Sequence, residues 1–316
     1  MIICLLPQDI VTGPKQPSEP FDEDDSSDDD DKVDPVLKKE FYRQLHESDG
    51  FDVDITLPNS SFSTFKCDDN NRDSDRDMLD IYARVALHWY NFHKGSNFQL
   101  STIYKYNSLL WNIFFYVYHI TLEAMDPTDE SCFTFQASVT NDARVYDKEL
   151  KIVLDGCRIK PQIPGTGDKI DRWDYMYHND EFYNGHLPKW YSDDALVMPS
   201  SDKHNQFYQV QDSDIRENDW LNMYAEIALY SLHEGDGSLL ESWLPVEISK
   251  VVVQTCEDVK SSKETLKAGN AIFYIAFKNL NAPPNGRLQD HRAIVRRVTD
   301  GVPGHVCLEF KCWRQK

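Results

Sequence analysis

Histidine and cysteine side chains are the first candidates for chemistry in this chain, because they bind metals and act as bases or nucleophiles. The chain has 10 histidines and 7 cysteines, but no HExxH, His-x-His or CxxC motif. His88 and His93 lie five positions apart, and on a helix this spacing turns the two rings away from each other. Cys307 and Cys312 have the same spacing in a predicted strand, where they face opposite sides. The sequence therefore predicts no metal site.

Motifs for nucleophilic catalysis and for phosphate binding are also missing. The chain has no Gly-x-Ser-x-Gly elbow, no GxxxxGK[ST] loop and no GxGxxG loop. Arg296 and Arg297 alternate in a predicted strand, so they point to opposite faces and form no phosphate groove. We predict no catalytic residue, no bound cofactor and no enzyme activity. The remaining enzyme hypothesis is a pocket with convergent polar side chains of perturbed pKa, which a sequence does not reveal.

The overall charge restricts the class of partner. The 316 residues include 33 Lys and Arg against 53 Asp and Glu, which gives a net charge of −20. Such a chain is a poor ligand for nucleic acids and anionic membranes, which bind cationic side chains. The apolar start breaks at Pro7 without a basic residue, unlike a secretory signal. The cysteines are odd in number and thinly spread, which favours a reducing compartment. Together these features predict a soluble cytoplasmic or nuclear protein without a transmembrane segment.

A block of negative charge lies near the N-terminus. Residues 22–31 read DEDDSSDDDD and hold eight carboxylates. Like charges repel one another and the block has nothing apolar to bury, so we expect disorder there. Ser26 and Ser27 lie in an acidic context that acidophilic kinases accept, while the plainer interpretation is a solvated tail. We assign residues 1–74 to an N-terminal arm that contains this run.

The chain contains an internal repeat at an offset of 142 residues, since Ile81–His88 (IYARVALH) aligns with Met223–Tyr230 (MYAEIALY). Both segments have apolar residues at helical spacing. Each is followed by four β-rich stretches, at 98–106, 112–124, 132–139 and 150–154, and then at 244–255, 270–279, 291–299 and 305–313. This order predicts an α+β fold of tandem halves, each with one helix packed on a four-stranded antiparallel sheet. The halves span 75–160 and 207–316.

The segment between the two predicted halves, 161–206, combines prolines and glycines with seven aromatic residues: Trp173, Tyr175, Tyr177, Phe182, Tyr183, Trp190 and Tyr191. A flexible linker would expose these rings to water at a cost in free energy. We therefore expect an ordered strap packed along one or both halves. The alternative is an exposed aromatic patch, which would be a binding site for a partner.

Several short strings resemble a known family. They are Tyr90-Asn91, Gly95–Leu100, Lys105–Asn107, Ile120–Leu122, Asp126-Pro127, Phe135-Gln136, Leu187–Trp190, Asp219-Trp220, Lys250–Val252 and Ala293–Val298. In this order they resemble a plant-specific family of uncharacterised cystatin-related proteins named partly after an embryo-defective locus. The resemblance covers about three quarters of the chain. It implies a plant origin, two cystatin/monellin-like halves and no established activity.

The resemblance suggests inhibition of papain-like cysteine proteases, which cystatins achieve with an N-terminal glycine, a Gln-x-Val-x-Gly loop and a Pro-Trp hairpin. The loop position falls at Trp111–Phe115 (WNIFF) and again at Leu266–Asn270 (LKAGN), and neither has the motif. Leu187–Trp190 contains proline and tryptophan but lies in the strap. An exposed 111–115 loop would favour an inhibitor, and burial of its aromatic residues would count against one.

The favoured hypothesis is a non-enzymatic module that binds a protein partner of unknown identity on the concave face or the edge of a sheet, where a partner segment could add as a strand. A diverged cysteine-protease inhibitor is the alternative.

Overall fold

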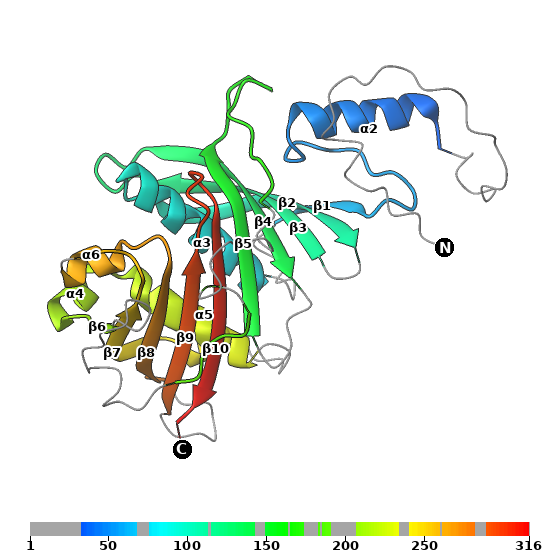
Figure 1. Ribbon diagram of the computed structural model, residues 1–316. Coiled ribbons are helices and arrows are strands. Elements are labelled where there is room, and N and C mark those ends of the chain that lie inside the picture. The colour runs from blue at the N-terminus through cyan, green and yellow to red at the C-terminus, as the bar shows by residue number, and fades with distance from the viewer. Residues whose placement is uncertain are drawn as a thin grey trace.

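A computed structural model describes residues 33–67, 76–112, 115–142, 149–163, 165–173, 183, 185–190, 207–233, 240–259, 261–281 and 289–315. The acidic run 22–31 and residues 234–239 and 282–288 lie outside this part of the chain. Figure 1 shows a large curved sheet with two long helices on one of its faces.

The sheet has ten strands in the order β1-β2-β3-β4-β5-β10-β9-β8-β7-β6, and every neighbouring pair is antiparallel. The strands are β1 (Phe62–Lys66), β2 (Gln99–Asn112), β3 (Phe115–Met125), β4 (Cys132–Asp142), β5 (Glu149–Ile159), β6 (Phe207–Gln209), β7 (Val246–Gln254), β8 (Ala271–Asn279), β9 (Asp290–Val298) and β10 (Val306–Arg314). The helices are α2 (Pro35–Glu47), α3 (Arg76–Lys94), α4 (Asp212–Glu217), α5 (Trp220–His233) and α6 (Ser262–Leu266), with a 3₁₀ turn η6 (Leu240–Trp243).

The prediction of two separate four-stranded sheets is wrong. β5 pairs with β10 over six positions, from Leu154 opposite Val306 to Glu149 opposite Lys311. This pairing joins the strands that follow α3 to those that follow α5 in a single sheet. The physical reason is that a four-stranded sheet would leave unpaired backbone groups along β5 and β10, and pairing the two strands satisfies them.

One hydrophobic core fills the inner face of the sheet, which we define as the face that carries α3 and α5. Side chains from both helices, such as Tyr82 and Tyr224, and from strands on both sides of the β5–β10 pair belong to the same buried cluster. The helices also contact each other through an ion pair of 2.5 Å between Arg84 Nη2 and Glu226 Oε2. A shared core of this kind is the second reason why the chain does not divide into two helix-on-sheet halves.

The inner core contains a fully buried arginine, Arg297 on β9. Its Nη2 donates to the carbonyl oxygens of Leu266 and Ala268, and its guanidinium lies over several rings, including Phe273 at 4.9 Å. Carbonyl acceptors and aromatic faces both offset the cost of burying this charge. Arg297 thereby fixes the 266–268 turn against the core.

The opposite face of the sheet, here the outer face, is covered by residues 48–57 and by the described residues of the predicted strap. Residues 48–57 follow α2 and lie over β2–β5, with hydrogen bonds and ion pairs to β2 and β5. Residues 173–190 belong to the predicted strap, and Trp173, Tyr183 and Leu187 are buried with outer-face residues of β5, β7, β8, β9 and β10.

Several elements were not expected from the sequence. Helix α2 begins at an Asp34 N-cap, whose side chain accepts from Val36 N, and has a proline in its first turn. β1 and β6 form the two edges of the sheet. Two helices, α4 and α5, form where the sequence predicted one, because α4 ends before Asn218 and α5 starts at Trp220.

Candidate functional site

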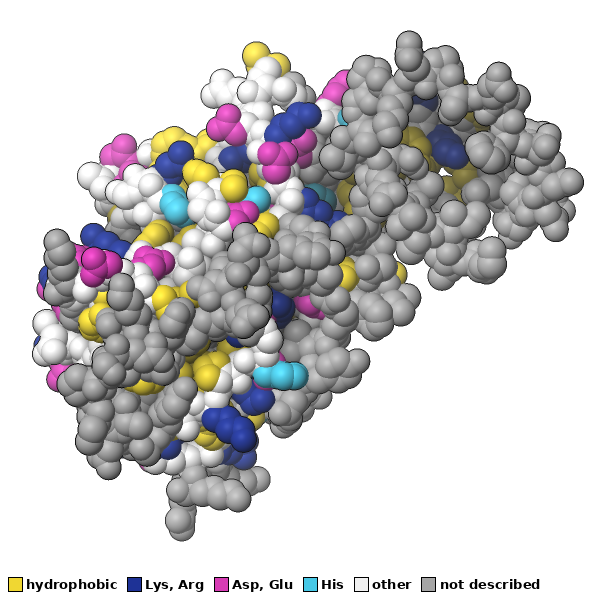
Figure 2. Space-filling model, in the orientation of Figure 1, with side chains coloured by type: hydrophobic (Ala, Val, Ile, Leu, Met, Phe, Trp, Pro, Cys, Tyr) yellow, Lys and Arg dark blue, Asp and Glu magenta, His cyan; other side chains and the backbone are white. Residues whose placement is uncertain are grey.

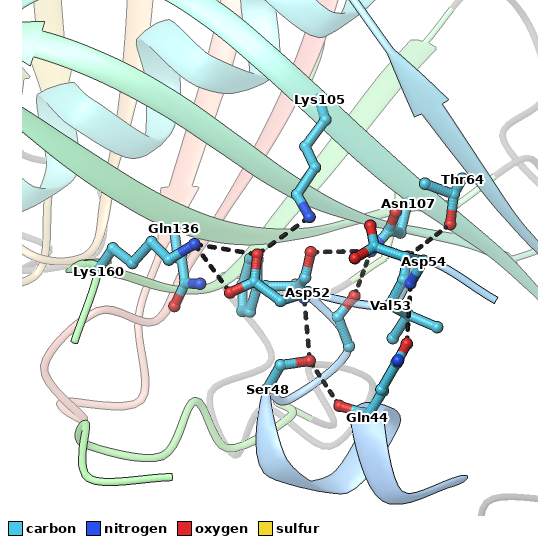
Figure 3. A network of polar contacts seen from close by, with 12 residues as sticks. Gln44, Ser48, Asp52, Val53, Asp54, Thr64, Lys105, Asn107, Gln136 and Lys160 are labelled. Carbon is cyan, nitrogen blue, oxygen red and sulfur yellow. Dashed lines mark hydrogen bonds and ion pairs between the residues drawn. The ribbon is translucent and has the colours of Figure 1, made fainter. Parts of the chain in front are cut away.

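Two areas of the outer face collect charged side chains beside aromatic rings. The first is the latched face, which we define as the outer face of β2–β5 under residues 48–55. Figure 3 shows the Asp52 carboxylate between two lysines, at 3.0 Å from Lys105 Nζ and 2.9 Å from Lys160 Nζ. Asp49 forms a third ion pair of 2.8 Å with Arg158 Nη1. Three cations, two on β2 and β5 and the third directly after β5, thus hold an acidic stretch of the chain.

Backbone contacts hold the same stretch on the latched face. Asn107 Nδ2 donates to the carbonyl oxygens of Gly50 and Phe51 at 2.6 and 3.0 Å. Phe51 is buried, with its ring edge-to-face against His119 at 5.1 Å and under the Arg158 guanidinium at 5.5 Å. Gly50 is required here, because a Cβ at this position would lie 2.9 Å from His119 Nε2.

The electrostatics of the latched face follow from burial and pairing. Burial by itself raises the pKa of the Asp52 carboxyl, but the ammonium groups of Lys160 and Lys105 outweigh it and hold this pKa below its ordinary value. Burial lowers the pKa of His119 to about 4, so the ring is neutral at pH 7. A neutral imidazole beside Phe51 leaves the lysines and arginine as the groups that attract the acidic segment.

The second area is the outer groove, a hollow of about 900 Å³ between the strap and the paired ends of β5 and β10. Figure 2 looks onto this side of the molecule, where Lys and Arg side chains lie beside hydrophobic ones over the lower ends of β9 and β10. The described residues that line the groove are Asp142, Glu149, Leu150, Lys151, Gly185, His186, Leu187, Pro188, Lys189, Trp190, Glu309, Lys311 and Trp313.

Strand register explains the row of charges on the floor of the groove. Glu309 on β10 lies directly opposite Lys151 on β5 and Arg296 on β9, so all three side chains point to the outer face. Lys151 Nζ lies 2.7 Å from the Glu309 carboxylate, and Arg296 Nε donates to its other oxygen. Burial opposes the Glu309 charge, but these two cations hold the pKa of its carboxyl below the ordinary value.

Aromatic residues form the wall of the groove. Trp190 from the strap packs edge-to-face against Trp313 at 6.0 Å and against Tyr274 at 5.7 Å. The Arg292 guanidinium lies over the Trp190 ring at 4.9 Å. The strap itself is held by Arg296 Nη2, which donates to the Gly185 carbonyl at 2.6 Å. The groove therefore combines fixed indole rings with ammonium and guanidinium groups.

A smaller hollow of about 580 Å³ lies between the end of α3, β5 and the 302–305 turn. Its deepest carboxylate, Asp155, accepts hydrogen bonds from Ser138, Thr140 and the Trp173 backbone N–H. Burial raises the pKa of Asp155. His305 on the same side bonds Asp300 through Nδ1 and the Asp171 carbonyl through Nε2. These groups hold the loops together and include no nucleophile activated by a base.

The residues considered for chemistry from the sequence fall in separate places. Cys307 belongs to the outer cluster and Cys312 to the inner core, as their spacing predicts. Arg296 and Arg297 also face opposite sides, towards Glu309 and the inner core respectively. The His88 ring stacks on Trp220 inside the molecule. Within the described ranges, no group of three or more His, Cys, Asp or Glu side chains could hold a metal ion.

The two loop positions considered for protease inhibition give little support to that function. Leu266 and Ala268 are buried and their carbonyl oxygens accept from Arg297, so these two residues of the 266–270 segment belong to the core, while Lys267 is exposed. Phe115 is buried at the start of β3, and the side chains of 111–114 lie outside the described residues. Leu187–Trp190 lines the outer groove instead of forming a second hairpin.

The acidic residues of the latched face were missed from the sequence. Asp52 and Asp54 alternate with Phe51 and Val53, a period-two pattern that indicates an extended segment with one side buried. Lys105 on β2, Arg158 on β5 and Lys160 just after β5 receive the acidic segment from more than 50 positions away, and carry no local signal.

Comparison with known proteins gives the family. A family model described as Protein MS5 matches residues 187–308. The UPF0725 protein At4g29550 of Arabidopsis thaliana is 57% identical over 282 residues, which covers 89% of this chain and 76% of that protein. The chain belongs to the MS5/UPF0725 family. A second member, the UPF0725 protein At4g28920, is 36% identical and covers 92% of this chain and 95% of its own length.

A solved member of the family has a related fold. The crystal structure of MS5 from Brassica napus superposes with a TM-score of 0.54 at 28% identity, over 76% of this chain and 98% of that chain. The plant family expected from the sequence is confirmed, while its cystatin-related character and division into two halves are not shown. The stretch matched by the MS5 model includes the groove residues Leu187–Trp190. No helix in the described part of this family member is long and apolar enough to cross a membrane.

Proposed function

We propose that this MS5/UPF0725 protein is a non-enzymatic protein-binding module, and that the outer groove receives an extended segment of a partner protein. One observation carries the proposal: a hollow of about 900 Å³ places two tryptophans beside lysine side chains on a rigid floor of paired strands. Tryptophan and arginine are the residues most often responsible for binding energy at protein interfaces.

The arrangement of the groove suits a peptide segment better than a reacting substrate. Its charged groups are paired with one another across the sheet, as in Lys151–Glu309 and Lys311–Glu149, and none forms a nucleophile–base pair. Strands on both sides of the β5–β10 junction supply the floor, so side chains there keep their positions when a ligand binds. The net charge of −20 favours a protein partner over a nucleic acid.

A peptide-display selection tests this function directly. Random peptides are selected on the full-length wild-type protein and counted in parallel on a Lys189→Glu variant, whose altered side chain is exposed in the groove wall. A Lys278→Glu variant is the control, because Lys278 is an exposed residue of β8 that does not line the groove. We expect sequences that enrich on the wild type and the control and are depleted on Lys189→Glu. Equal enrichment on all three proteins, or none, would contradict the proposal.

Inhibition of cysteine proteases is the competing function. Two residues of its expected contact loop at 266–270, Leu266 and Ala268, are held in the core by Arg297. In a titration against a papain-like protease at neutral and mildly acidic pH, we therefore expect no inhibition at tens of micromolar protein, a concentration on the order of 10⁴ times the dissociation constant of a nanomolar complex. Stoichiometric inhibition at sub-micromolar concentration would replace the proposed function.

A further inference from the structure

The latched face shows which kind of segment the outer face of this sheet binds. The bound stretch Asp49–Asp54 has the sequence Asp-Gly-Phe-Asp-Val-Asp. Two of its carboxylates pair with Arg158, Lys105 and Lys160, and the Phe51 ring between them is buried under a guanidinium. Asn107 holds the backbone at the same point. The protein thus contains, within its own chain, an acidic segment with an aromatic residue bound by outer-face cations.

The outer groove presents related chemistry on the same side of the same sheet. Among described residues, the basic groups in or directly against it are Lys151, Lys189, Lys311, Arg292 and Arg296, and the acidic groups are Asp142, Glu149 and Glu309. The difference, 5 − 3, leaves two positive charges in a chain whose total is −20. A local excess of positive charge on an acidic protein attracts an acidic ligand selectively.

The two areas also share the pairing of a guanidinium with an aromatic ring. On the latched face Arg158 belongs to the sheet and Phe51 to the bound segment. In the groove, Arg292 and Trp190 both belong to the protein, and Trp190 lies beside Trp313. A ligand that enters the groove therefore meets an aromatic wall and cationic groups together. This combination recognises a carboxylate next to an apolar side chain.

We infer that the outer groove binds an extended acidic segment of a partner protein in which an aromatic or aliphatic side chain lies between carboxylates, the pattern that Asp49–Asp54 shows within this chain. The inference rests on the proposed function and adds the chemical class of the partner. The carboxylates pair with Lys189 and Arg292 at the wall of the groove, and the apolar side chain packs against the two tryptophans.

The probe is an octapeptide with the sequence of Ser48–Ile55 (SDGFDVDI), capped at both ends and titrated into the full-length protein by calorimetry at low ionic strength. We expect saturable binding. Its affinity should fall about tenfold when the first two aspartates of the peptide are changed to asparagine, because the peptide then loses its charge pairs with the cations of the groove. Addition of salt should also weaken it. No saturation at millimolar peptide, or equal binding of the asparagine peptide, would overturn the inference.

Protein variants locate the bound peptide. Lys189→Glu alters an exposed side chain and should weaken binding about tenfold, while Lys278→Glu outside the groove should leave the affinity unchanged. Trp190→Ala removes the aromatic wall and should abolish binding, with circular dichroism as the check on its fold. If the peptide binds Lys189→Glu and a folded Trp190→Ala as well as it binds the wild type, it occupies another surface and the inference fails.

Failure of the inference is distinguishable from failure of the proposed function. If the display selections enrich neutral or basic peptides whose binding depends on Lys189, the groove is a protein-binding site but its partner is not acidic. Selections that enrich nothing would reject both.

Discussion

The latched face and the outer groove lie on the same side of one sheet, but they differ in whether the binding surface or the bound segment supplies the aromatic ring. On the latched face the sheet and the residue directly after β5 supply polar groups, Asn107 and three cations, and the covering segment supplies the aromatic ring of Phe51. In the outer groove the protein supplies both the indole rings and the cations. The first arrangement suits a segment that is always present in the chain, and the second suits a ligand that comes from outside.

The two areas also differ in how closely they are tied to the rest of the fold. Glu309 on the groove floor belongs to the strand pair that joins the two ends of the sheet. Asn107 on the latched face lies on β2, next to the edge strand β1. Changes at the groove floor should therefore affect global stability, whereas changes on the latched face should release a local segment.

The largest effect is expected for Glu309→Gln. This change removes the carboxylate that the half-buried Lys151 and the buried Arg296 share. Removing one partner of a buried ion pair costs about 3 kcal/mol. We expect the free energy of unfolding in urea to fall by that amount, with loss of cooperativity across the whole sheet. The control Glu247→Gln, at an exposed site on β7, should stay within about 0.5 kcal/mol of wild type. Equal stability of both variants would show that the groove floor does not tie the sheet together.

A smaller and more local effect is expected for Asn107→Ala. The variant removes two hydrogen bonds and leaves the buried carbonyls of Gly50 and Phe51 without donors, which costs about 2 kcal/mol. Hydrogen exchange should accelerate in residues 48–57 and remain slow in β8 and β9. The contrary result, uniform acceleration through the sheet, would mean that the latched face is as central to stability as the groove floor.

A third effect concerns the pH dependence of stability and applies to the latched face, where His119 lies. His119 has a pKa of about 4 in the folded protein against 6.5 for an unperturbed histidine, so the unfolded chain binds its proton more readily between these values. Its contribution to stability is complete above pH 6.5 and is lost as the pH falls towards 4. His119→Gln should reduce the slope of stability against pH by up to about 1.4 kcal/mol per pH unit in this window. Unfolding midpoints measured from pH 7 to pH 4 check this, and identical slopes would show that the folded and unfolded chains bind the His119 proton equally well.

Local patterns in the sequence predicted much of the secondary structure but not how it assembles. The observed strands β2–β5 and β7–β10 overlap the predicted ranges, because β-branched and aromatic residues mark them. The pairing of β5 with β10 was missed, since the two strands are about 150 residues apart and nothing near either one specifies its partner. The start of helix α2 has a sequence signal, an Asp34 N-cap followed by Pro35. It was missed because the nearby acidic run led to the assignment of the whole segment to an N-terminal arm.

The candidate groove was even less accessible from the sequence. Leu187–Trp190 is recognisable in the sequence as a displaced proline–tryptophan motif. Its neighbours in the groove, Lys151, Glu309 and Trp313, come from two distant strands. Their proximity depends on the register between β5 and β10. A site built by register in this way is visible only once the sheet is assembled.

The most direct test of the account is hydrogen–deuterium exchange of the full-length protein with and without the SDGFDVDI octapeptide. We predict slower exchange in Gly185–Trp190, the strap segment that forms one wall of the groove, and no change in residues 48–57. Protection confined to 48–57 and β1, or no protection anywhere at saturating peptide, would contradict the assignment of the outer groove as the site that binds an acidic partner.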